Sequence, residues 1–296
     1  MTLAKKSTAF LSTLDRSSNT IRTYRNALIA FGRCVGKDAD LTEDNYVKFL
    51  KSIKELSSST KHVYKTAITR FYIFNHAALA QDLKEISDHY IKRVKDDLPE
   101  FDEQAIQTLV EYCGKLQGDL LSLRDKAFVY VCVDSGFRIS EVSQLKRGQV
   151  KWDEECAIIT GKGDKKAKVR FSRRAILALK AYLSKRDKLV ESGVLMVDQP
   201  LFARHDKMAS KKLRGVSRSG TGMREAIKSR MEEAGIPRES IRIHDFRHYF
   251  TTLYYRKTKD ILRTKERARH SSIITTQRYA HISEDDQEYD KIFNGV

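Results

Sequence analysis

A proline set among charged residues, about a third of the way along the chain, limits how the chain can fold. Only three prolines occur in 296 residues, and Pro99 closes the run Lys95-Asp-Asp-Leu-Pro. Proline interrupts a helix, and charged neighbours oppose burial. A chain of this length is also long enough for two domains of ordinary size. We therefore predict a first domain over residues 1–95, a linker over 96–101 and a second domain over 102–296.

The first domain has the apolar spacing of a small helical module. Apolar residues recur every three or four positions between residues 21 and 31, and Gly36 is placed to end that helix. Thr42 is a candidate N-cap for a second helix. Further helices are predicted from about residue 59 and over residues 82–94. The module carries basic residues that either bind a polyanion or are ordinary solvated side chains: Arg22, Arg25, Lys51, Lys54, Lys61, Lys65 and Arg70.

The second domain is predicted to be mostly helical, with a small antiparallel sheet. Asp102 is a candidate N-cap, and an apolar run at 127–133 ends at Gly136, which can adopt the left-handed conformation that closes helices. Residues 157–160 and 168–171 have the pattern of two strands joined by the turn at 161–164. The whole chain is therefore predicted to be mainly α, with a mixed second domain.

The charge of the chain points to a polyanionic partner. The formal net charge is +17, while 41% of the residues are hydrophobic, so each domain can bury a core. Nucleic acid is the commonest partner of such a protein. A segment at 203–222 either follows a DNA backbone or is a flexible charged loop, and its basic residues are Arg204, Lys207, Lys211, Lys212, Arg214 and Arg218.

Cysteine usage and hydropathy indicate a reduced compartment inside the cell. The four cysteines are far apart and form no Cys-x-x-Cys pair, so neither a zinc knuckle nor a disulfide framework is indicated. The apolar run near the N-terminus is too short for a signal peptide, and no stretch of about 18 apolar residues occurs. We expect a cytoplasmic protein, associated with the nucleoid and without a membrane span.

Several residues in the second half have the chemistry to bind and attack a phosphodiester. Arg138 lies beside a predicted helix start, where it can hold a phosphate. His244 and Arg247 are three apart on one helix face, which pairs a proton carrier with a guanidinium. A zinc site at His244 and His248 is disfavoured, because Asp245 replaces the glutamate that such a helix needs. The Gly161-Lys-Gly163 sequence does not match a nucleotide-binding loop either.

Four segments together resemble a known family. SGFRISEV, TGKGDKK, HDFRHYFTT and RHSSIITTQRYAHI are similar to the signature boxes of the tyrosine recombinase (phage integrase) family, most of all to its Xer-type members. The family usually has Leu-Gly before its second histidine, where this chain has Ala268-Arg269. The resemblance implies that Glu141 supports the first arginine and that the catalytic residues are Arg138, Lys162, His244, Arg247, His270 and Tyr279.

The resemblance implies a site-specific DNA recombinase that needs no cofactor and no metal. Tyr279 would form a 3′-phosphotyrosyl bond, which conserves the energy of the phosphodiester for rejoining. His244 is the candidate base for the tyrosine, and Lys162 is the candidate acid for the departing 5′ oxygen. Two other functions stay open: a type IB topoisomerase with the same chemistry, and a non-catalytic DNA-binding regulator on the same fold.

The expected partners are double-stranded DNA and other recombinase subunits. The first domain would act as a SAM-like core-binding domain and close around the duplex with the catalytic domain. The tail at 284–296 is acidic but keeps Tyr289, Ile292 and Phe293, so we expect it to dock on a neighbouring subunit. The assembly would be a homotetramer, or a heterotetramer with a paralogue. The role, either chromosome and plasmid dimer resolution or integration of a mobile element, is left open.

Overall fold

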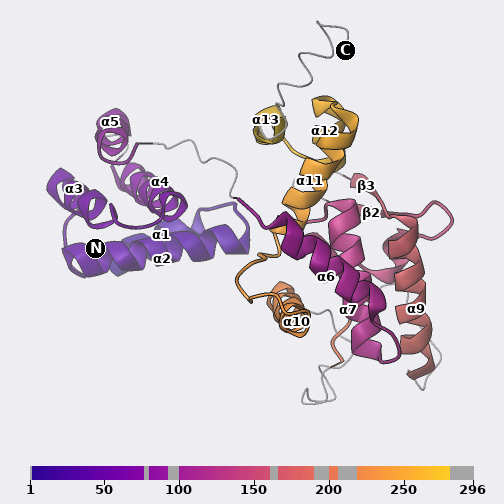
Figure 1. Ribbon diagram of the computed structural model, residues 1–296. Coiled ribbons are helices and arrows are strands. Elements are labelled where there is room, and N and C mark those ends of the chain that lie inside the picture. The colour runs from indigo at the N-terminus through magenta and orange to yellow at the C-terminus, as the bar shows by residue number, and fades with distance from the viewer. Residues whose placement is uncertain are drawn as a thin grey trace, which may run out of the picture. The chain divides into compact units, whose positions relative to one another are not determined.

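A computed structural model of the chain describes residues 2–76, 80–92, 100–160, 166–189, 200–205 and 219–280. The fold divides into two compact units, Met1–Asp96 and Asp97–Val296 (Figure 1). Each unit has its own hydrophobic core. The described residues are mainly helical, with one three-stranded antiparallel sheet, so the predicted fold class is confirmed. Lys162, the linker residues 96–99, positions 206–218 of the basic loop and the tail lie outside the described residues.

The first unit is a bundle of helices around an aromatic core. Phe31 packs edge-to-face on Phe49 and on Tyr72, with ring centroids 5.4 and 5.7 Å apart. Tyr46 lies 5.0 Å from Tyr72, and all four rings are fully buried. The helices described in this unit are α1 (Leu3–Ser12), α2 (Ser18–Val35), α3 (Glu43–Ser52), α4 (Ser58–Asn75) and α5 (Ala80–Tyr90).

The sequence predicted two helix ends in this unit correctly, but it missed one helix and made another too long. Gly36 follows α2 with φ of +108°, and the Thr42 side chain accepts from the Asn45 backbone N–H at 3.3 Å, so both predicted helix ends are confirmed. Helix α1 was not predicted, and α5 ends at Tyr90, before the predicted limit at residue 94.

Lys65 was placed among basic residues that either bind a polyanion or are solvated, and for Lys65 this prediction is wrong. Its side chain is buried, and its ammonium group donates to Asp88 Oδ1 at 2.5 Å and to the Ile91 carbonyl at 3.1 Å. A buried ammonium needs such acceptors, because leaving it unpaired costs several kcal/mol. Lys65 therefore joins α4 to α5 and its following turn.

The second unit is built around α7, which is buried on nearly all sides. Helix α7 packs on α6, α9 and α11 (Figure 1). The sheet has the order β1-β2-β3, and the register of its longer pair joins Cys156 to Arg170 and Thr160 to Lys166. The helices before and after the sheet are α6 (Glu103–Lys115), α7 (Leu120–Ser135), α8 (Ile139–Gln144), α9 (Arg173–Leu189), α10 (Gly220–Glu233), α11 (Asp245–Thr258), α12 (Ile261–Ala268) and α13 (Ile273–Ala280), and the strands are β1 (Val150–Lys151), β2 (Cys156–Thr160) and β3 (Lys166–Arg170).

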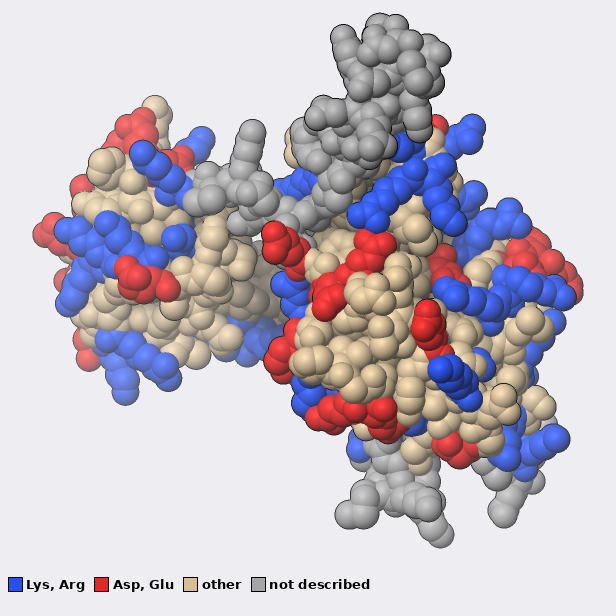
Figure 2. Space-filling view, viewed as in Figure 1, with Lys and Arg blue, Asp and Glu red and all other residues tan. Residues whose placement is uncertain are grey.

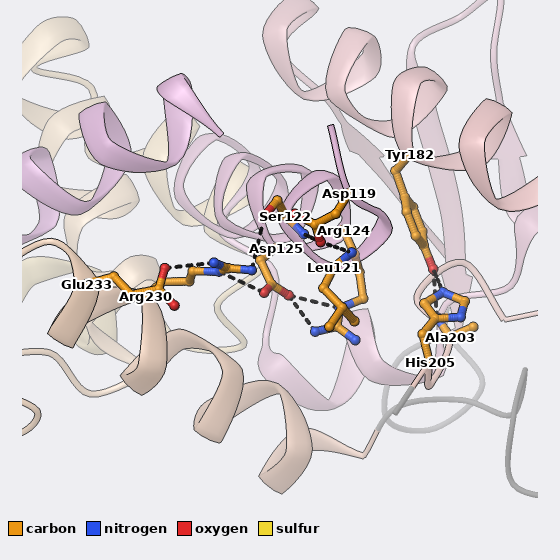
Figure 3. A network of polar contacts seen from close by, with 10 residues as sticks. All are labelled: Asp119, Leu121, Ser122, Arg124, Asp125, Tyr182, Ala203, His205, Arg230 and Glu233. Carbon is orange, nitrogen blue, oxygen red and sulfur yellow. Dashed lines mark hydrogen bonds and ion pairs between the residues drawn. The ribbon is translucent and has the colours of Figure 1, made fainter. Parts of the chain in front are cut away.

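A polar network joins α10 to α7 (Figure 3). Arg230 on α10 donates to Asp125 Oδ2 at 3.1 Å and to Ser122 Oγ at 3.3 Å. Asp125 also accepts from its buried neighbour Arg124 through Nε and Nη2, at 2.9 and 2.7 Å. The Asp125 carboxylate on α7 therefore binds both Arg124 and Arg230. Through Arg230 it fixes α10, the helix after the basic loop, against α7.

The surfaces of both units carry many Lys and Arg side chains (Figure 2). Carboxylates are interspersed with them on the visible face of the second unit. Within the described residues, no helix is both long enough and apolar enough to cross a lipid bilayer.

Candidate active site

The first element of the site is the junction between α7 and α8, which presents Arg138. Arg138 is the N-cap of α8, and its backbone N–H donates to Glu141 Oε2 at 2.8 Å while its Nη1 donates to Oε1 at 2.9 Å. The Arg138 side chain keeps 44% of its surface exposed. Burial alone would raise the pKa of Glu141, but the charges of Arg269 and Arg138 outweigh it and lower that pKa. Glu141 thus stays ionised and orients Arg138.

Gly136 makes this junction possible. It closes α7 in the left-handed conformation, with φ of +59°. A Cβ atom at this position would lie 2.3 Å from Cδ1 of Phe250, which is far inside contact distance. A side chain is therefore excluded by backbone conformation and by packing together.

Arg247 is held by the backbone of two different segments. It lies on α11, is buried, and donates from Nη1 to the Gly136 carbonyl at 2.5 Å and from Nη2 to the Ala268 carbonyl. Burial and the charges of Arg138 and Arg269 lower the pKa of Arg247, but a guanidinium still stays protonated near neutral pH. Arg247 therefore links the α7–α8 junction to the end of α12.

The Ala268-Arg269 departure from the family pattern preserves the helix end. Arg269 takes the left-handed conformation, with φ of +57° and ψ of +44°, and follows α12. Its backbone N–H bonds the Glu266 carbonyl, and that of His270 bonds the Lys265 carbonyl, both at 3.0 Å. A residue with a Cβ atom loses about 1–2 kcal/mol in this conformation relative to glycine. The turn therefore forms at a conformational cost that a glycine would avoid.

His270 follows this turn and is half-buried. Its Nδ1 lies 2.9 Å from the hydroxyl of Thr276, and its ring stacks on that of Tyr279 with centroids 6.1 Å apart. Burial, followed by the charges of Arg247 and Arg138, lowers the pKa of His270 to about 3. The imidazole is therefore neutral in the DNA-free protein.

The hydroxyl of Tyr279 is bonded to His248. Its oxygen lies 2.7 Å from His248 Nδ1, and only 2% of the Tyr279 surface is exposed. Burial raises the pKa of Tyr279 and lowers that of His248 to about 4. His244 is exposed, and its ring lies 4.8 Å from that of His248. His244, the predicted base, therefore contacts the partner of the tyrosine hydroxyl.

Sequence reasoning missed His248 and Arg269 as members of the site. His248 was considered only as a zinc ligand, although its spacing of four from His244 places both rings on one face of α11. Arg269 was noted only as a departure from the family pattern. Its Nη2 donates to Glu141 Oε2 at 2.8 Å, and the only sequence signal was that an arginine stands where the family pattern has glycine.

A cavity of about 890 Å³ opens beside these residues. Thr160 and Lys166 line it, and these two residues flank the segment that contains Lys162. Arg138, Glu141, Arg269 and His270 line it as well. Among the described residues, no group of three His, Cys, Asp or Glu side chains is arranged to hold a metal ion.

Comparison with known proteins identifies the family. The model of the phage integrase family matches residues 99–286. The chain belongs to that family. Among its relatives in the family are tyrosine recombinase XerC of Herpetosiphon aurantiacus, 27% identical over 91% of this chain and 86% of the relative, and tyrosine recombinase XerH of Campylobacter jejuni, 26% identical over 83% and 68%. The predicted resemblance to Xer-type tyrosine recombinases, and with it the predicted enzyme class, is confirmed.

Solved structures of the family share the fold. A XerH recombinase bound to its difH substrate after cleavage superposes with a TM-score of 0.70 at 22% identity, covering 92% of this chain and 78% of that one. The integrase of transposon Tn1549, in complex with circular-intermediate DNA, gives a TM-score of 0.67 at 14% identity, with 94% of both chains covered.

Proposed function

We propose that this chain is a site-specific DNA recombinase that cleaves and rejoins strands through a 3′-phosphotyrosyl bond on Tyr279. One observation carries the assignment. Arg247 joins the segment of Arg138 to the segment of His270, whose ring stacks on that of Tyr279. A mere DNA-binding protein has no need to gather these groups around a buried tyrosine.

Arg138, Arg247 and His270 form the proposed phosphate clamp. Negative charge grows on the phosphate oxygens as the bond to Tyr279 forms, and donors fixed in advance stabilise it. Each guanidinium can also contact two oxygens at once. With the Thr276 hydroxyl donating to Nδ1 of His270, the Nε2–H of that ring can donate to a third oxygen.

The reaction also moves two protons. Tyr279 Oη attacks phosphorus while the bond to the 5′ oxygen breaks, and the tyrosine proton passes to an imidazole. The motifs assign that role to His244, and the hydroxyl is bonded to His248, so we assign proton removal to this pair of rings. Lys162 is the proposed donor to the departing 5′ oxygen. Thr160 and Lys166, on either side of its segment, line the cavity beside Arg138.

Double-stranded DNA is the proposed partner of both units. Exposed basic residues occur in each, and relatives of the same fold have been solved as DNA complexes. We assign residues 1–95 to core-site binding and residues 102–296 to catalysis. A cytoplasmic, nucleoid-associated location follows from this role.

We also propose a tetramer on DNA, formed with copies of this chain or with a paralogue. The tail at 284–296 would dock on the neighbouring subunit. A variant that lacks this tail should bind a single site normally but fail to join two sites in a gel-shift assay of synapsis. Normal synapsis without the tail would contradict this part of the proposal.

Covalent capture tests the central proposal. The purified protein is mixed with nicked fragments of the host's genomic DNA, the mixture is denatured, and the ends of protein-linked DNA are sequenced. Tyr279→Phe is the control, since it keeps the ring and removes only the nucleophilic oxygen. Adducts at one repeated sequence, absent from the control, are the expected result.

The other outcomes separate the competing functions. Adducts scattered over all sequences indicate a type IB topoisomerase-like enzyme. Binding without an adduct, also in the presence of a paralogue from the same host, indicates a regulator that has kept the fold. An adduct from Tyr279→Phe removes the assignment of the nucleophile.

A further inference from the structure

We propose that Arg269 is a positioning residue of the phosphate clamp, one that neutralises Glu141 so that the charge of Arg138 remains available to the scissile phosphate. This inference rests on the proposed function and extends it to a residue where the family pattern has glycine. The Arg269 side chain is largely buried, with 13% of its surface exposed, and its guanidinium is paired with Glu141.

The Arg269 guanidinium contacts the segment of Arg138 through Nη2 and the ring of Phe137, while its Nη1 donates to the Arg267 carbonyl on α12 at 3.4 Å. Nη2 donates to Glu141 Oε2 at 2.8 Å and to the Gly136 carbonyl at 3.3 Å. The guanidinium carbon lies 5.4 Å from the ring centroid of Phe137, in a cation–π arrangement. These three residues belong to the short segment that contains Arg138. The side chain of Arg269 therefore braces that segment from the C-terminal end of α12.

The backbone of the turn is tied to the same segment. The Arg269 carbonyl accepts from Arg138 Nη2 at 3.5 Å, and the carbonyl of the preceding Ala268 accepts from Arg247. The Gly136 carbonyl accepts from both Arg247 and Arg269. The carbonyls of Gly136, Ala268 and Arg269 therefore hold the guanidinium groups of the clamp, and Arg269 adds a second ion pair to Glu141 beside that of Arg138.

Charge explains why a guanidinium here affects the chemistry. Glu141 is nearly buried and accepts from both Arg138 and Arg269. Without Arg269, the charge of Glu141 would be balanced by Arg138 alone, and that pair would present no net charge to a phosphate. With Arg269, one positive charge is left over. Arg138 is the exposed member of the three, so this charge faces the cavity.

The conformation of Arg269 supports a role beyond ending a helix. A glycine would adopt its φ of +57° without strain, so helix termination alone does not require this side chain. The variant Arg269→Gly therefore separates the two roles. It should relax the turn and at the same time remove the partner of Glu141.

The test is single-turnover adduct formation on a nicked duplex that carries the site captured with the wild-type protein. Arg269→Gln and Arg269→Gly should each slow cleavage by roughly 10- to 100-fold at saturating protein, because the clamp loses both its alignment and its net charge. The dissociation constant for DNA should change by less than about threefold, since only 13% of this side chain is exposed and its polar contacts are made to protein groups. Arg269→Lys keeps the charge and should restore part of the rate.

Two controls make the result specific. Arg263→Gln removes the same charge from α12, the helix that Arg269 follows, at a side chain that is 74% exposed, and should cleave at the wild-type rate. Adding Glu141→Gln to Arg269→Gln should cost less than the two single losses combined, because the unbalanced carboxylate is then gone.

The outcomes separate this inference from the proposed function. Wild-type cleavage by both Arg269→Gly and Arg269→Gln would overturn the role of Arg269 while leaving the recombinase assignment intact. Slow cleavage that merely follows a loss of thermal stability in Arg269→Gln, with full activity in Arg269→Gly, would reduce Arg269 to a structural residue. A wild-type protein that forms no covalent adduct with any DNA would overturn both proposals.

Discussion

At the scale of single residues, Gly136 bears the most constraints. It closes α7 with positive φ, leaves room for Phe250, and offers the carbonyl that holds Arg247. Gly136→Ala should lower the free energy of unfolding by about 2–4 kcal/mol, because left-handed strain adds to the overlap with Phe250. Denaturant unfolding measures this loss. Cleavage by the folded fraction should fall as well, since Arg247 loses its alignment.

A second glycine supplies the matched control. Gly118 also has positive φ, +86°, but a Cβ atom there would meet no atom within 4 Å. Gly118→Ala should show only the backbone cost, about 1–2 kcal/mol, and normal cleavage. Equal losses for the two variants would show that Phe250 yields easily and that packing at Gly136 matters little.

At the scale of elements, local signals predicted helix ends and strand pairing well. The Asp102 side chain accepts from the Ala105 backbone N–H at 2.8 Å as an N-cap, and β2 pairs with β3 as the hairpin pattern indicated. Helix caps and hairpins depend on a few neighbouring residues, so they can be predicted from the local sequence alone. Arg138 at the start of α8 could be placed for the same reason.

Features that depend on distant partners could not be predicted in this way. Lys65 is buried because Asp88 and the Ile91 carbonyl, 23 and 26 residues away, are acceptors for it. The contacts of Arg269 with Glu141 and of Tyr279 with His248 span 128 and 31 residues. No local pattern specifies which of several candidates will meet across such separations.

The contact between α11 and α13 should make the second unit sensitive to acid. The pKa of His248 on α11 is about 4, below its ordinary value of 6.5, because of burial in the first place. As the pH falls from about 6.5 to about 4, His248 becomes protonated in the unfolded chain but stays neutral in the folded chain. The free energy of unfolding therefore decreases. The loss from this one group should be on the order of 2–3 kcal/mol at pH 4.

The variant His248→Asn isolates this contribution. An asparagine amide can still bond the Tyr279 hydroxyl, but it does not titrate. Urea unfolding between pH 4 and pH 7 should therefore show a shallower pH dependence for the variant, by up to about one proton. An unchanged slope would assign the acid sensitivity to other groups, such as His270.

At the scale of the whole molecule, the net charge of +17 sets the character of DNA binding. Phosphate contacts release counterions, so affinity should fall by about 10³- to 10⁵-fold between 50 and 200 mM salt if 6–10 phosphates are contacted. Arg22 and Arg25 are exposed on α2 of the first unit, whereas the Lys65 side chain carries the same charge but is buried and paired with Asp88. Arg22→Gln or Arg25→Gln should therefore reduce the slope of log affinity against log salt by about one, and Lys65→Met should leave it unchanged.

Fluorescence anisotropy over a salt series measures all three slopes. If neither arginine variant changes the slope, the first unit binds DNA through another face; if Lys65→Met lowers it as much as they do, the slope reports total charge and identifies no contact surface.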